Sequence, residues 1–194
     1  FTGIQGDIFE HTLAALRVSK IANGVSQIHG AVAQNMWGHY TEIPQIIAIT
    51  NAQQKKFWVD PILDQALAEK DTQLLRSRKL ELKKNLFIKV ADQTGKLLDP
   101  NVFTIVWARR FATYKRPKLI TLEKDRFDAI FVNGKYPVQV IWAGKPYPKD
   151  PEGIALFNEL VNFTAGYDNL AILTGYELEL SGMLKKGGDL WLNN

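Results

Sequence analysis

Four cationic side chains gather in one short stretch, WARRFATYKRP, which runs from Trp107 to Pro117. Arg109 and Arg110 follow an apolar run that reads as a buried strand, and Lys115 and Arg116 precede a segment that reads as a helix. The carboxyl ends of parallel strands and the first turns of helices both attract anions. An arginine fork can also hold two phosphate oxygens at once. The stretch therefore predicts a site for one phosphate, or for two adjacent phosphates.

A solvated basic loop that only keeps the protein soluble explains the same composition equally well. Neither a GxGxxG pattern nor a GxxxxGK[ST] pattern follows the first predicted strand. A dinucleotide fingerprint and a P-loop are thus excluded, because both hold phosphate on a glycine-rich backbone. An anion at this place would be held mainly by side chains.

The composition indicates a soluble globular protein. The chain has 194 residues, of which 46% are apolar and 23% are charged, and its net charge of +4 is too small to demand a nucleic-acid partner. It has no cysteine, and His11 and His39 have no metal-binding partner at useful spacing, so we predict no metal site. No apolar run approaches the length of a membrane span. We expect no membrane partner and a cytoplasmic location.

From about residue 100 onward, strands and helices alternate. Continuous apolar runs predict strands at 101–108, 137–144, 169–175 and 189–194, and amphipathic segments predict helices at 116–131, 150–166 and 176–188. This alternation favours an α/β fold with right-handed crossovers onto a parallel sheet flanked by helices.

Helical patterns dominate the first half of the chain. Asp60 and Pro61 predict the start of a helix over 60–69, and Asp71 and Gly95 predict the two ends of a helix over 71–95. Two further helices are predicted over 9–22 and 25–37, with a short strand at 45–50. We expect residues 1–60 to be helical material of another domain, or of a shell around this one, and residues 61–194 to form the α/β domain.

Several segments resemble, in order, those of the α-glucan (glycogen and maltodextrin) phosphorylases. ARRFATYKRP is similar to the phosphate-site motif of the bacterial branch of that family, and ALRVSKIANGVSQIHG is similar to its ALRxSxxxNGVSxLHG segment. ITNAQQKKFWVDP, VIWAGKPYP and GGDLWLNN occupy the places of three further family segments. The resemblance implies a two-lobed GT-B glycosyltransferase architecture. Residues 1–60 would be the helical end of the N-terminal lobe, and 61–194 the first half of the Rossmann-like C-terminal lobe.

The resemblance also implies a reaction and its ligands. A glucosyl unit passes from an α-1,4-glucan to inorganic phosphate, which gives glucose 1-phosphate with retention at the anomeric carbon. The family uses pyridoxal 5′-phosphate, whose phosphate exchanges a proton with the substrate phosphate, and its members are commonly homodimers.

Five residues match family positions with known roles. By that match, Arg110 binds the substrate phosphate, Arg109 lies near the cofactor phosphate, and Lys115 reaches both phosphates. Tyr114 would contact the glucosyl unit, and His29 would belong to the sugar pocket. Taken without the resemblance, His29 reads as a packed core histidine and Tyr114 as a cap on the sheet edge. Lys145 is given no role, and the five tryptophans are expected in the core rather than on a sugar platform.

The chain departs from the family pattern in two places. It contains no segment similar to EASGTSGMK, which carries the family's cofactor lysine, so we interpret the chain as an internal fragment. We predict that the chain alone neither retains pyridoxal phosphate covalently nor converts glucan. Ala52 and Gln53 stand where the family has Gly-Val, and alanine would resist a left-handed turn there. Two alternatives stay open: a non-catalytic glucan-binding paralogue, and a GT-B glycosyltransferase that uses a sugar nucleotide.

Overall fold

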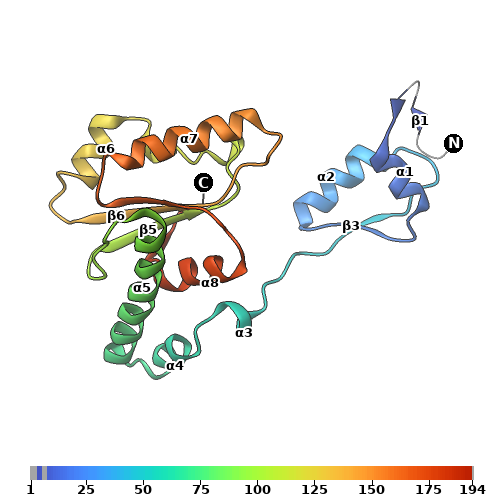
Figure 1. Cartoon of the computed structure of the whole chain (residues 1–194). Helices are drawn as coiled ribbons and strands as arrows, with labels where there is room; N and C mark the ends of the chain where they lie inside the picture. Colours follow the sequence, from blue (N-terminus) through green and yellow to red (C-terminus); the bar gives the residue numbers. More distant parts are fainter. Residues whose placement is uncertain (1–3, 6–7, 194) are drawn as a thin grey trace. The chain divides into compact units, whose positions relative to one another are not determined.

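The computed structural model describes residues 4–5 and 8–193, and its chain forms two compact units, residues 1–54 and 55–194 (Figure 1). None of the helices within this described part is long and apolar enough to cross a membrane. The assignment of residues 1–60 and 61–194 to two lobes of a larger enzyme stays a prediction.

The first unit combines short strands with two helices. Its elements are β1 (Ile4–Gln5), β2 (Ile8–Phe9), α1 (His11–Val18), β3 (Ala22–Gly24), α2 (Gln27–Trp37) and β4 (Ile46–Ala48). β1 pairs with β2 in antiparallel fashion, and β3 pairs with β4 in parallel fashion. The strand predicted over 45–50 is confirmed as β4. The helix predicted over 9–22 is too long, because the backbone becomes extended at Ser19 and residues 22–24 pair as a strand.

Three helices open the second unit: α3 (Lys55–Trp58), α4 (Pro61–Glu69) and α5 (Thr72–Thr94). The carboxylate of Asp60 accepts hydrogen bonds from the first free N–H groups of α4, and that of Asp71 does the same for α5. Such caps satisfy donors that have no partner inside the helix. Gly95 ends α5. The boundaries predicted for α4 and α5 are therefore confirmed.

A four-stranded parallel sheet forms the centre of the second unit. Its strands are β5 (Phe103–Ala108), β6 (Val138–Ala143), β7 (Leu170–Leu173) and β8 (Leu190–Trp191), in the spatial order β7-β6-β5-β8. α6 (Lys124–Phe131) and α7 (Pro151–Ala165) cover one face, while α5 and α8 (Leu178–Gly187) cover the other (Figure 1). The predicted α/β fold, a Rossmann-like parallel sheet flanked by helices, is confirmed.

Both faces of the sheet carry apolar side chains. Val106 and Ala108 pack toward α5 and α8, and Trp107, between them, packs toward α6 and α7. A strand covered on both sides has no face turned to solvent, which explains why β5 reads as a nearly unbroken apolar run. Trp107 and Trp142 are fully buried, as expected, whereas the other three tryptophans are half-buried.

A half-buried lysine joins α7 to the sheet. The ammonium of Lys96 donates hydrogen bonds to the carbonyl oxygens of Thr164 (2.5 Å), Tyr167 (2.7 Å) and Leu170 (2.7 Å). The last carbonyls of a helix have no partner within the helix, and a cation there also complements the helix dipole. Lys96 therefore fixes the point at which α7 ends and β7 begins.

Candidate anion site at the carboxyl edge of the sheet

Arg109 and Arg110 directly follow β5, at the edge where the carboxyl ends of all four strands lie. The N–H of Arg109 donates to the carbonyl of Ala143, which extends the pairing of β5 and β6 by one residue. The side chain of Arg109 is half-buried and that of Arg110 is exposed. The sequence predicted both arginines just beyond the carboxyl end of a parallel strand, and they lie there in the structure.

The chain after Arg110 is held at two points. Phe111 is fully buried, and its ring contacts those of Trp107 and Phe157 at centroid distances of 5.1 and 5.0 Å. Six residues later, the indole N–H of Trp142 donates to the carbonyl of Pro117 at 3.0 Å. The turn that carries Tyr114 and Lys115 lies between these two points and is thereby attached to the sheet.

The predicted helix over 116–131 is wrong in its first half. Lys115 ends a single turn of 3-10 helix, η1 (Thr113–Lys115), and α6 begins only at Lys124. Arg116 has a left-handed backbone, with φ 48° and ψ 50°. A proline disfavours the α-helical conformation in the residue before it, so Pro117 prevents a helix from starting at Arg116. The prediction that Lys115 and Arg116 lie at the start of the next helix is therefore wrong, and the amino end of α6 is not at these two residues.

Tyr114 and Lys115 interact with each other. The ammonium of Lys115 lies 4.6 Å from the centroid of the Tyr114 ring, a cation–π contact, and Tyr114 is 69% exposed. Within the described residues, no carboxylate pairs with Arg110 or with Lys115. Cations that no carboxylate neutralises raise the local positive potential, which attracts anions to this edge.

Gly144 brings β6 close to the end of β5. It has φ +152°, and a Cβ atom placed on it would lie 2.0 Å from the carbonyl oxygen of Arg109. Only a residue without a side chain allows this approach. Sequence reasoning passed over Gly144, although its position directly after an apolar strand was a usable signal. Its neighbour Lys145 forms an exposed ion pair with Glu177, at 3.5 Å.

His29 belongs to the first unit and is exposed, so the alternative reading as a packed core histidine is wrong. It lies in the first turn of α2, where its N–H donates to the N-cap hydroxyl of Ser26. Its ring Nδ1 accepts a hydrogen bond from the N–H of Val25 at 3.1 Å. In the neutral ring the proton is therefore on Nε2, which is left as a donor. Its role in a sugar pocket stays a prediction.

Ala52 does not have the strained left-handed backbone that was expected where alanine stands in place of glycine. The non-glycine residues with positive φ in the described chain are Glu42, Lys70 and Arg116, and Ala52 is not among them. The loop at 51–53 therefore needs no left-handed residue at this position.

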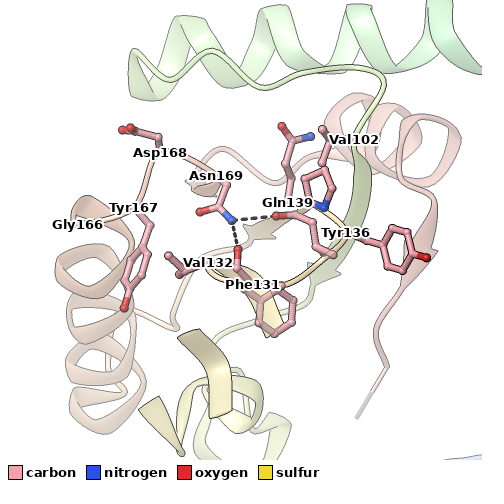
Figure 2. A pocket seen from close by; sticks show the side chains of 12 residues that line it. Val102, Phe131, Val132, Tyr136, Gln139, Gly166, Tyr167, Asp168 and Asn169 are labelled. Carbon is pink, nitrogen blue, oxygen red and sulfur yellow. Dashed lines mark hydrogen bonds between the residues drawn. The ribbon is translucent and has the colours of Figure 1, made fainter. Parts of the chain in front are cut away.

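A cavity of about 500 Å³ opens at the opposite, amino edge of the sheet (Figure 2). Asn169 lines it, and its side-chain amide donates to the carbonyls of Phe131 and Val138, both at 2.8 Å. None of the five predicted site residues lines this cavity. It is thus separate from the candidate anion site.

Comparisons with known proteins agree with the motifs in the sequence. No family model matches the chain. An uncharacterized protein of Methanocaldococcus jannaschii is 48% identical over 98% of this chain and 36% of its own length. The maltodextrin phosphorylase of Thermococcus litoralis is 29% identical over 99% of this chain and 28% of its own length. The glycogen phosphorylase of Aquifex aeolicus is 28% identical over 96% of this chain and 33% of its own length.

The chain spans about a third of the length of these relatives, between 28% and 36%. The similarity extends along nearly all of this chain and includes phosphorylases of Thermococcus, Mycobacterium and Aquifex. These matches support the assignment of the chain to a phosphorylase-related family.

Proposed function

We propose that this chain is the part of an α-glucan phosphorylase that holds the substrate phosphate. The parent protein would transfer a glucosyl unit from an α-1,4-glucan to inorganic phosphate and release glucose 1-phosphate. The observation that carries the proposal is the pair of cations without a carboxylate partner, Arg110 and Lys115, at the carboxyl edge of the sheet. The similarity to phosphorylases along the chain supports the same reaction.

Each candidate residue of the second unit has a part in this proposal. The guanidinium of Arg110 binds two oxygens of the substrate phosphate, and the ammonium of Lys115 adds charge beside it. Arg109 and Lys115 face a second phosphate, that of pyridoxal 5′-phosphate. Two phosphates repel each other strongly in a cleft of low dielectric constant, so several fixed cations are required to bring them together. Tyr114 contacts the glucosyl unit.

The cations of the candidate site fit the phosphate end of pyridoxal 5′-phosphate. Arg109 and Lys115 suit its phosphate. Its aldehyde requires a lysine, and the sequence has no segment similar to the one that carries the family's cofactor lysine. When bound, the cofactor would supply a phosphate that exchanges a proton with the substrate phosphate. We assign no covalent step to this chain.

The test uses the protein expressed from its complete gene, incubated with maltodextrin and inorganic phosphate. We expect release of glucose 1-phosphate, and a loss of about 10²–10³-fold in kcat for Arg110→Met, the usual cost of removing one charge-stabilising donor. Arg126→Met is the matched control, because Arg126 is an exposed arginine on α6. Equal rates for the two variants would remove Arg110 from the site.

Two further outcomes would favour the alternatives. Retention on a glucan resin without any release of glucose 1-phosphate would indicate a non-catalytic glucan-binding protein. Saturable binding of a nucleotide sugar would indicate a sugar-nucleotide-dependent glycosyltransferase. A complete protein that binds no pyridoxal phosphate would overturn the proposal.

A further inference from the structure

A second cavity, of about 780 Å³, lies between α4, α5 and the amino-terminal end of β5. Five apolar residues line it: Leu63, Leu75, Leu80, Pro100 and Phe103. The large side chain of Phe103 is 47% exposed. Sites for small molecules have this size and are mostly apolar, with a few polar groups that orient the ligand. It is remote from the strand ends that carry Arg109 and Arg110, because Phe103 begins β5 and Arg109 follows its end.

Positively charged side chains outnumber negatively charged ones in the lining of this cavity. Arg76, Lys79 and Lys83 line it together with one carboxylate, that of Asp189. The ammonium of Lys83 is 2.6 Å from one oxygen of that carboxylate, which also accepts the N–H of Thr104 at 2.9 Å. The ammonium of Lys79 is 3.9 Å from the other oxygen. The Asp189 carboxylate thus binds Lys83 and the backbone closely. It offsets the positive charge of Lys79 only at the longer distance.

Lys79 is a half-buried cation whose one ion pair among the described residues, with Asp189, is long at 3.9 Å. Its side chain is 28% exposed, and its ammonium donates to the carbonyls of Lys186 and Gly188. An ammonium has three N–H donors, so one remains for a ligand. Burial lowers the pKa of Lys79, the charge of Asp189 raises it in part, and the neighbouring charge of Lys83 lowers it further. An anion beside Lys79 would add negative charge there.

Arg76 adds a second cation, one turn earlier on α5. It is exposed, and among the described residues no carboxylate pairs with it. The anion would therefore be bound from two sides, while the apolar residues form the rest of the wall. A multiply charged phosphate would leave most of this apolar surface unused.

We propose that this cavity binds a free medium-chain fatty acid. The carboxylate lies against Lys79 and Arg76, and the hydrocarbon chain covers Leu75, Leu80 and Phe103. The choice of a fatty acid as the ligand rests on charge complementarity at one end of the cavity and on the apolar lining of the remainder. It does not depend on the proposed reaction with glucan.

The test titrates octanoate into the protein expressed from its complete gene by calorimetry, with 1-octanol as the uncharged comparison. Because a hydrogen bond to a charged group contributes about 1.5–3 kcal/mol, we expect octanoate to bind at least about tenfold more tightly than octanol. Lys79→Met should remove that advantage. Leu75→Asp places a negative charge on the wall and should abolish octanoate binding. Lys89→Met, an exposed lysine on the same helix, should change nothing.

Equal affinities for octanoate and octanol would overturn the proposal, as would equal effects of Lys79→Met and Lys89→Met. Absence of saturable octanoate binding would do the same. If circular dichroism shows that Lys79→Met does not fold, Arg76→Gln and Leu75→Asp decide in its place. Both alter side chains exposed to solvent, and both must weaken octanoate binding for the proposal to stand.

Discussion

Gly144→Ala tests whether the close approach of β6 to Arg109 shapes the candidate anion site. The new Cβ atom would lie 2.0 Å from the Arg109 carbonyl oxygen and 3.1 Å from a ring carbon of Phe111. Real Cβ atoms do not come within 3.0 Å of other heavy atoms. The first contact involves backbone, so no side-chain rotation can relieve it. The chain must move at Gly144 or at Arg109.

The cost has two sources. A side chain at φ +152° strains the backbone by about 1–3 kcal/mol. Forcing an extra carbon into packed structure costs about 1–3 kcal/mol more. We therefore expect the variant to lose about 2–6 kcal/mol in its free energy of unfolding. Arg109 should shift as well, which would weaken phosphate binding.

The assay is urea denaturation of Gly144→Ala beside a matched control, Gly175→Ala. Gly175 also has positive φ, +65°, but no heavy atom lies within 4 Å of the place that its Cβ atom would take. Gly175→Ala should thus show conformational strain alone, about 1–2 kcal/mol. If Gly144→Ala loses no more stability than Gly175→Ala, the contact with Arg109 is not tight and the reasoning is refuted.

Two further predictions concern the scaffold. The hydrogen bond from Arg78, followed by those from the N–H groups of α4, lowers the pKa of Asp60, so its stabilisation is complete above pH 3.8 and is lost as the pH falls through the folded-state value. Asp60→Asn should cost about 2–4 kcal/mol at pH 7, and progressively less in denaturation curves recorded below pH 3.8. Lys96→Met removes the donor that three carbonyls share, of which that of Thr164 keeps the N–H of Tyr167, and it should cost about 2–4 kcal/mol. Hydrogen exchange should then locate the loosening at the end of α7, and a uniform loss of protection would contradict this assignment.

The parallel sheet could be predicted because its signals are local. Both faces of the strands are covered, so β5 and β6 are nearly continuous apolar runs that need no knowledge of their partners. Asp60 and Asp71 are likewise local signals, since each caps N–H groups two and three residues away. Elements of this kind follow from short stretches of sequence.

The details of the site depend on contacts that sequence patterns do not contain. Gly144 and Arg109 meet because Ala108 pairs with Ala143 in the register of β5 and β6, which no local pattern specifies. The strand β3 depends in the same way on its pairing with β4. The late start of α6 is different, because Pro117 was visible and its effect on Arg116 was predictable.

The late start of α6 changes how the candidate site can hold an anion. Had Lys115 opened a helix, free N–H groups and the helix dipole would share the charge of a phosphate with the side chains. With α6 beginning at Lys124, the contribution of that helix is absent at Lys115, and the side chains carry more of the interaction. Arg110 and Lys115 should then matter more individually than cations in a site built on a helix start. An exposed, side-chain-based site is also strongly screened by salt, so phosphate affinity should fall steeply with ionic strength.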